Sequence, residues 1–410
     1  MKETGKIRFH VPEPGCRPGE RPDFGGLNVP EAGGARRPEI DVAPEDIRDL
    51  AFSPVRVLND AGRAVGPWAE DVPEEVLQAG LRHMMTLRSF DGRMLKAQRQ
   101  GKTSFYMQHL GEEAVSCAFG LALRDGDMNF PTYRQAGLLI ARDYPLTTMM
   151  NQIYSNREDP IKGRQMPIFY SAKDHGFFSL SGNLGTQFVQ AVGWAMASAM
   201  TGDTRISAAW IGDGSTAEND FHSAMVFAST YKPPVVLNVV NNQWAISTFQ
   251  GVARGSAMSF AERGHGFGIP ALQVDGNDYI AVHAVARWAA ERARAGHGPT
   301  LIEHVTYRSG GHSTSDDPSA YRSQDEAEAW PLGDPIERLK RHLVELGAWS
   351  DERHAQLEAE ILDRVREAQK AAEANGTLLD GARPSPRDMF EDVYAEMPPH
   401  LWAQRQEAGF

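Results

Sequence analysis

The segments IGDGSTAEND at residues 211–220 and NNQWAIST at residues 241–248 give the clearest indication of the fold class. The first segment continues the apolar run ISAAWI, and the second continues the apolar run VVLNVV. Short apolar runs of this length are typical of buried strands. Between them, Phe221, Met225 and Ala228 recur at the spacing of one helical face. The order strand, helix, strand within about 35 residues predicts a parallel βαβ unit.

The same alternation continues on both sides of this unit. Apolar residues at helical spacing predict further helices, and one more apolar run predicts a further strand. We expect helices at residues 76–87 (entered through Pro73), 112–123, 186–200 and 279–294, and a strand at 300–307. These elements predict an α/β fold, a doubly wound and mostly parallel sheet with helices on both faces.

Changes in composition divide the chain into three parts. Residues 1–72 are rich in Pro and Gly and show no lasting period, so we expect an extended N-terminal arm lying over another part of the protein. A disordered tail is the alternative, and apolar residues such as Phe24 and Leu50 argue against it. Residues 73–334 form the expected α/β domain, and residues 335–410 form a helical C-terminal tail.

The overall composition limits the classes of function. The chain has 410 residues and a formal net charge of −12, which argues against a general nucleic-acid binder because such proteins carry a basic surface. Its only cysteines, Cys16 and Cys117, exclude a disulfide framework and favour a reducing compartment. The first residues lack the apolar core of a secretory signal, and no apolar stretch is long enough to span a bilayer. We therefore expect a cytoplasmic protein without a membrane segment.

The two segments that follow the strands carry the chemistry of the site. Asp213, flanked by Gly212 and Gly214, follows the first strand, and Asn242 follows the second, so both should lie at the sheet edge where α/β proteins bind ligands. Glycines permit a sharp turn and a close approach of ligand, and the N-terminus of the following helix attracts anions. The Asp213 carboxylate, the Asn242 amide oxygen and the Trp244 carbonyl, with phosphate oxygens and water, would complete a magnesium shell. The plain alternative is a tight turn with a solvated Asp213.

This arrangement resembles the thiamine-diphosphate motif. From about residue 73 to residue 330 the chain is also similar to the alpha subunits of branched-chain 2-oxo acid dehydrogenases. Besides the GDG and NN pair, the matching segments are TYRQAG (132–137), GRQMP (163–167), LGTQ (184–187) and GGHSTSDDPSAYR (310–322). Chance agreement at so many separate places is remote, so the resemblance is specific.

The resemblance implies roles for particular residues. Tyr133 and Arg134 would contact the diphosphate, which a forked cationic donor such as Arg suits. Gly182 would present its carbonyl to the aminopyrimidine, and Leu184 would lie under the cofactor. His312 would handle proton transfer near the cofactor and orient the lipoyl acceptor, work that suits a group titrating near neutrality. The whole expected cofactor-binding set is Tyr133, Arg134, Gly182, Leu184, Gly212, Asp213, Gly214, Ser215, Asn242, Trp244, Arg308 and His312.

Relatives of this kind also bind potassium in the loop that matches SGNLGTQ. The corresponding potassium ligands here would be Ser181, Asn183, Thr186 and Gln187. The loop departs from the family pattern, because relatives often carry Ser-Pro where Gly182 and Asn183 stand, and an ordinary helix N-cap is the alternative interpretation. Val240 is a second departure: some relatives place an Arg there, so Arg134 and magnesium must carry more of the diphosphate charge.

The activity implied by the resemblance is oxidative decarboxylation of a branched-chain 2-oxo acid. The acyl group would pass to a lipoyl domain of a separate acyltransferase core. The glutamate that activates the cofactor has no counterpart in this chain and would come from a beta subunit, in an alpha2-beta2 heterotetramer. A pyruvate or acetoin dehydrogenase alpha subunit is the nearest alternative. A scaffold of the same fold that has lost the site is a further one, against which the intact Asp213, Asn242, Arg134 and His312 argue.

Overall fold

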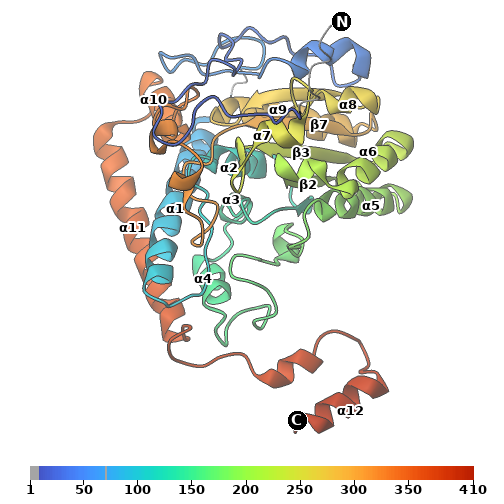
Figure 1. The fold of residues 1–410 in the computed structure, drawn as a ribbon, viewed down its shortest axis with the longest axis vertical. Helices are drawn as coiled ribbons and strands as arrows, with labels where there is room; N and C mark the ends of the chain where they lie inside the picture. Colours follow the sequence, from blue (N-terminus) through green and yellow to red (C-terminus); the bar gives the residue numbers. More distant parts are fainter. Residues whose placement is uncertain (1–8, 70–71) are drawn as a thin grey trace, which may run out of the picture.

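A five-stranded sheet forms the centre of the protein (Figure 1). The computed structural model describes residues 9–69 and 72–410, so residues 1–8 and 70–71 of the expected arm lie outside it. The sheet has the order β1-β2-β3-β7-β6, and every neighbouring pair is parallel. Its strands are β1 (Met128–Phe130), β2 (Ser207–Gly212), β3 (Val235–Asn241), β7 (Thr300–Val305) and β6 (Ala271–Asp275). The predicted α/β class with a mostly parallel sheet is confirmed.

Helices cover both faces of this sheet. The strands β2 and β3 are buried along nearly their whole length, and their side chains alternate between two apolar clusters as the pleat requires. Ala209 and Leu237 face α5 (Thr186–Met200) and α6 (Asn219–Tyr231). Trp210 and Val236 belong to the other cluster, which contains residues of α1 (Glu74–Arg99), α2 (Glu113–Ala122) and α9 (Tyr279–Arg294).

Most of the predicted elements are present. The helices α5 and α9 have the predicted bounds, and β2 and β3 differ from prediction by about one residue at an end, within the usual scatter of such assignments. β1 was not predicted because three residues show no period. β6 was not predicted because its sequence contains Gln273 and Asp275. Both are buried and satisfied by tertiary partners: Gln273 donates to Glu303, and Asp275 pairs with Arg56 and Arg338.

The N-terminal arm packs against the edge strand β6. Its described part contains a short 3-10 helix, η1 (Pro44–Ala51). This helix was not predicted, because the arm sequence shows no lasting helical period. Val55 forms a parallel bridge with Val274, and Trp68 makes an edge-on contact with Trp288 at 6.0 Å between ring centroids. The main apolar cluster includes these arm residues along with residues of the α/β domain and the tail. The arm therefore contributes to the core.

The remaining elements surround this core. They are α3 (Gly137–Ile140), α4 (Leu146–Tyr154), η2 (Lys173–His175), η3 (Gly214–Ala217), β4 (Trp244–Ala245), β5 (Thr248–Phe249), α7 (Gln250–Arg254), α8 (Arg263–Gly266), η4 (Pro318–Ala320), η5 (Gln324–Glu326), α10 (Pro335–Glu345), α11 (Asp351–Ala374), η6 (Pro386–Phe390) and α12 (Pro399–Glu407). Figure 1 shows α11 beside α1 and the last segment, with α12, running away from the sheet. In the described part of the chain, no helix combines the length and apolar character needed to cross a bilayer.

Candidate active site

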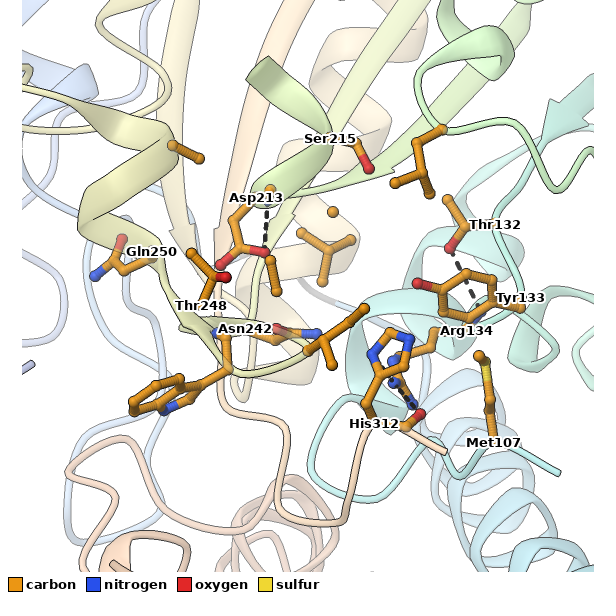
Figure 2. A pocket seen from close by; sticks show the side chains of 18 of the residues that line it. Met107, Thr132, Tyr133, Arg134, Asp213, Ser215, Asn242, Thr248, Gln250 and His312 are labelled. Carbon is orange, nitrogen blue, oxygen red and sulfur yellow. Dashed lines mark hydrogen bonds between the residues drawn. The ribbon is translucent and has the colours of Figure 1, made fainter. Parts of the chain in front are cut away.

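A cavity of about 540 Å³ opens at the carboxyl ends of β2 and β3, and we call it the sheet-edge cavity (Figure 2). Gly212 and Val240 are paired at the ends of these strands, so the two predicted segments begin side by side. The predicted residues that line the cavity are Tyr133, Arg134, Gly182, Leu184, Gly212, Asp213, Gly214, Ser215, Asn242, Trp244 and His312. Five stretches distant in the sequence therefore meet in one place.

The turn around Asp213 explains one of its two flanking glycines. A side chain at Gly212 would meet open space within the cavity, whereas a Cβ at Gly214 would lie 2.4 Å from the Cβ of Ala245. Glycine at position 214 therefore allows the β4 segment to approach. Ser215 follows in η3 and is also buried at the cavity. The turn thus presents backbone atoms and one carboxylate to the cavity with little side-chain bulk.

Asp213 is almost fully buried, at 2% exposed. Its Oδ1 atom accepts a hydrogen bond of 2.9 Å from the backbone of Gly214, and its Oδ2 atom has no partner among the described residues. Burial raises the pKa of this carboxyl to about 7. An unpartnered buried carboxylate oxygen is costly, and a bound cation would remove that cost. Among the described residues, no cluster of three or more His, Cys, Asp or Glu side chains could bind a metal ion. A cation here would therefore need amide or backbone carbonyl oxygens in addition to the carboxylate.

Asn242 and Trp244 supply the other expected oxygens. The Asn242 side chain is buried, donates from Nδ2 to Glu112 at 2.8 Å, and accepts a long 3.4 Å contact from the Trp244 backbone. The Trp244 carbonyl accepts a hydrogen bond of 3.0 Å from Nη1 of Arg308. A carbonyl oxygen has two lone pairs, so one remains available for a cation.

Arg134 and Tyr133 follow β1 and lie on the opposite wall of the cavity. Arg134 donates to the backbone carbonyls of Gln108 and His312, and its guanidinium lies 5.4 Å from the centre of the Tyr133 ring. Tyr133 also stacks with Phe169 at 6.3 Å. These contacts hold the guanidinium in a fixed place at the cavity, as recognition of an anionic group requires.

His312 lies between two cations. Its Nδ1 atom is 3.3 Å from Nη2 of Arg134 and 3.3 Å from Nη1 of Arg308. Because guanidinium groups only donate hydrogen bonds, Nδ1 must accept, and the ring proton of the neutral imidazole is then on Nε2. Burial and the positive charges of Arg134 and Arg308 lower the pKa of His312 to about 3. The expectation that His312 titrates near neutrality is therefore wrong for this arrangement, because the side chain is neutral and carries a donor at Nε2.

Arg308, the remaining predicted cofactor residue, is buried behind the cavity. It donates to the carbonyls of Trp244 and Ile246 and to the hydroxyl of Tyr321 at 2.7 Å. Val240 is buried at the cavity wall, at the position where an Arg is expected in some relatives. Among the described residues, Arg134 is therefore the one arginine that lines the cavity.

The loop before α5 contributes to the other end of the cavity. Gly182 and Leu184 line it, and Leu184 is 48% exposed at its mouth. The four residues predicted for potassium gather at the start of α5 but do not line the cavity: Ser181, Asn183, Thr186 and Gln187. Gln187 donates from Nε2 to the Ser181 carbonyl at 3.0 Å, and its Oε1 atom has no described partner. A cation would require this amide to turn its oxygen inward.

Sequence reasoning missed several residues of the cavity. Glu112 was predicted only as the start of a helix, and no local motif marks it as a site residue, because only the folded chain brings it to Asn242. An apolar wall was also missed, and it consists of Phe105, Met107, Met166, Phe169, Ile246 and Val252. Met166 lies in the GRQMP segment, which could have indicated it. The cavity is therefore lined both by polar side chains, including Asp213 and Arg134, and by apolar side chains from several segments.

Comparison with known proteins identifies the family of this chain. The model of the family described as "Dehydrogenase E1 component" matches residues 81–379, and that of "2-oxoisovalerate dehydrogenase E1 alpha subunit N terminal" matches residues 6–45. The chain is 60% identical to the 2-oxoisovalerate dehydrogenase subunit alpha of Pseudomonas aeruginosa, over 100% of both chains. It is 41% identical to the mitochondrial subunit of Mus musculus (86% of this chain, 78% of the relative) and 38% identical to that of Homo sapiens (98% and 88%). The chain therefore belongs to the dehydrogenase E1 component family.

Proposed function

We propose that this chain is the alpha subunit of a branched-chain 2-oxo acid dehydrogenase that uses thiamine diphosphate and magnesium in the sheet-edge cavity. The observation that carries the proposal is the unpartnered, buried Oδ2 atom of Asp213 beside Asn242 at the carboxyl edge of the sheet. The names of the relatives support the substrate class, since they are 2-oxoisovalerate dehydrogenase alpha subunits.

The residues of the cavity fit these two groups. Asp213, Asn242 and the Trp244 carbonyl would hold magnesium, while Arg134, Tyr133 and the turn at residues 212–215 would bind the diphosphate. The cofactor, when bound there, would supply the chemistry that decarboxylates a 2-oxo acid. In this chain Leu184 and Gly182 would support the ring end of the cofactor, and neutral His312 would donate from Nε2 to a developing negative charge.

The proposal includes partner proteins. The described residues of the cavity wall contain two carboxylates, Asp213 and Glu112, and both lie at the Asn242 end. The glutamate that activates the ring end would then come from a beta subunit, in an alpha2-beta2 heterotetramer. A lipoyl domain of an acyltransferase core would receive the acyl group at the mouth of the cavity. A potassium ion held by Ser181, Asn183, Thr186 and Gln187 would fix the loop that carries Leu184.

The substrate preference tests the proposal directly. Together with its beta subunit, the chain should act on 4-methyl-2-oxopentanoate and 3-methyl-2-oxobutanoate with kcat/KM values at least about 100-fold above that for pyruvate. The apolar wall offers contacts that pyruvate cannot make, and each methylene contributes roughly 10- to 200-fold. The measurement is decarboxylation coupled to acylation of a lipoyl domain. A preference for pyruvate would favour a pyruvate or acetoin dehydrogenase, and absence of cofactor binding in calorimetry would favour a non-catalytic scaffold.

A single substitution at the proposed metal site should separate metal binding from folding. Asp213→Asn removes one anionic ligand, so we expect affinities for magnesium and thiamine diphosphate to fall together by roughly 10- to 100-fold. The thermal midpoint without cofactor should stay near that of the wild type, since the substitution removes a buried unpartnered charge. Titration calorimetry of cofactor at fixed magnesium gives the affinities. Wild-type affinity in this variant would place the metal elsewhere.

A further inference from the structure

Glu112 is a buried carboxylate to which the family motif assigns no role. It is the residue before α2, its side chain is 2% exposed, and it lines the sheet-edge cavity. Its backbone is fixed on both sides, because its N–H donates to the His109 carbonyl and its own carbonyl accepts from Val115. The backbone that carries this carboxylate is therefore fixed, and the side chain contacts a residue 130 positions away in the sequence.

That contact is with the side chain of Asn242. The Oε1 atom of Glu112 accepts a hydrogen bond of 2.8 Å from Nδ2 of Asn242. A carboxylate accepts hydrogen bonds but does not donate them, so it selects the nitrogen end of the amide. The reversed amide would bring its oxygen against Oε1, and two buried acceptors would then face each other. Glu112 thereby leaves Oδ1 of Asn242 as the end that a cation in the cavity can meet.

The neighbours of Glu112 reinforce this arrangement. Nε of Arg134 lies 3.8 Å from the same Oε1 atom, so the carboxylate also faces the guanidinium that lines the cavity. Its second oxygen, Oε2, has no partner among the described residues. One buried group is thus adjacent to both the proposed magnesium ligand and the proposed diphosphate-binding Arg.

We propose that Glu112 is a positioning residue that fixes the Asn242 side chain with its oxygen directed to magnesium. The inference rests on the proposed function, in which Asn242 is a magnesium ligand. Groups that orient a metal ligand through its other polar atom commonly change metal affinity by about 10- to 100-fold when removed. Glu112 acts through Asn242 in this way and need not contact the metal itself.

The test uses the full chain purified with its beta subunit and measures magnesium affinity by calorimetry at saturating thiamine diphosphate. Glu112→Ala should weaken magnesium binding by about 10- to 100-fold. Glu112→Leu, which keeps most of the volume but cannot accept a hydrogen bond, should show the same loss if the Ala variant fails to fold. Glu112→Gln keeps an acceptor for Nδ2 and should bind magnesium within about threefold of the wild type. Gln binding as weak as that of Ala or Leu would overturn the proposal.

A matched control and a double-mutant cycle make the test specific. Glu113→Gln changes the next residue, which is also buried but is paired with Arg88 at 2.7 Å and lies outside the cavity wall. It should keep wild-type magnesium affinity, although its thermal stability should fall. In an Asn242→Ala background, Glu112→Ala should cause less than about a twofold further loss, because its partner is gone. Fully additive losses would show that Glu112 acts elsewhere and would overturn the inference.

The outcomes also separate this inference from the proposed function. If the wild-type complex binds no thiamine diphosphate in a magnesium-dependent way, the proposed site itself is wrong. If the wild type binds both and Asp213→Asn loses them, but Glu112→Ala and Glu112→Leu bind magnesium normally, only the role of Glu112 is wrong.

Discussion

Purified without a partner, the chain is expected to decarboxylate no 2-oxo acid at a measurable rate, and turnover should appear when the beta subunit is added. The reason is the distribution of acidic groups in the cavity. Glu112 accepts a hydrogen bond from Asn242, and Asp213 lies at the same end of the cavity as Asn242. Within the described cavity wall, no carboxylate lies beside Gly182 and Leu184. On the proposed function, the base that activates the cofactor ring would therefore have to come from the beta subunit.

The measurement is carbon dioxide release from 3-methyl-2-oxobutanoate by the chain alone, by the beta subunit alone and by the mixture. Calorimetry on the isolated chain provides the control, because residual binding of thiamine diphosphate would show that the diphosphate end is intact. Steady turnover by the isolated chain, after removal of every trace of partner, would contradict the prediction and place the activating group within this chain.

The second large effect concerns His312. We expect His312→Ala in the complex to lower turnover by roughly two to three orders of magnitude, the range typical of removing one hydrogen-bond donor aimed at developing negative charge. Folding should be little affected, because the hydrogen bond of 2.6 Å from Arg134 goes to the backbone carbonyl of His312 and survives the substitution. The Nδ1 atom that is lost accepts only from two guanidinium groups that retain other partners.

Single-turnover decarboxylation and acylation of a lipoyl domain should be measured separately for this variant, together with its thermal midpoint. His222→Ala is a suitable control, because His222 is exposed on α6 and does not line the cavity. A large loss of thermal stability with normal activity per folded molecule would give His312 a structural role.

The central βαβ unit and the sheet edge that carries the candidate site could both be predicted from local sequence patterns. The strands β2 and β3 are buried on both faces, so their apolar runs are continuous and leave a local signal. The helices α5 and α9 likewise carry long periodic patterns. Because the carboxyl ends of adjacent parallel strands meet at one edge, the order of the elements alone places the turn at Asp213 beside the segment at Asn242.

Other features depend on contacts between distant residues and could not be predicted from local patterns. β6 is a strand although it contains Gln273 and Asp275, because distant partners satisfy both side chains. The pKa of His312 is lowered by burial and by the charge of Arg134, which lies in a loop 178 residues away in the sequence. Glu112 meets Asn242 across 130 residues. Local sequence patterns indicate which face of a helix or strand is apolar. The orientation and charge of a buried polar group depend instead on neighbours that only folding brings within a few ångströms.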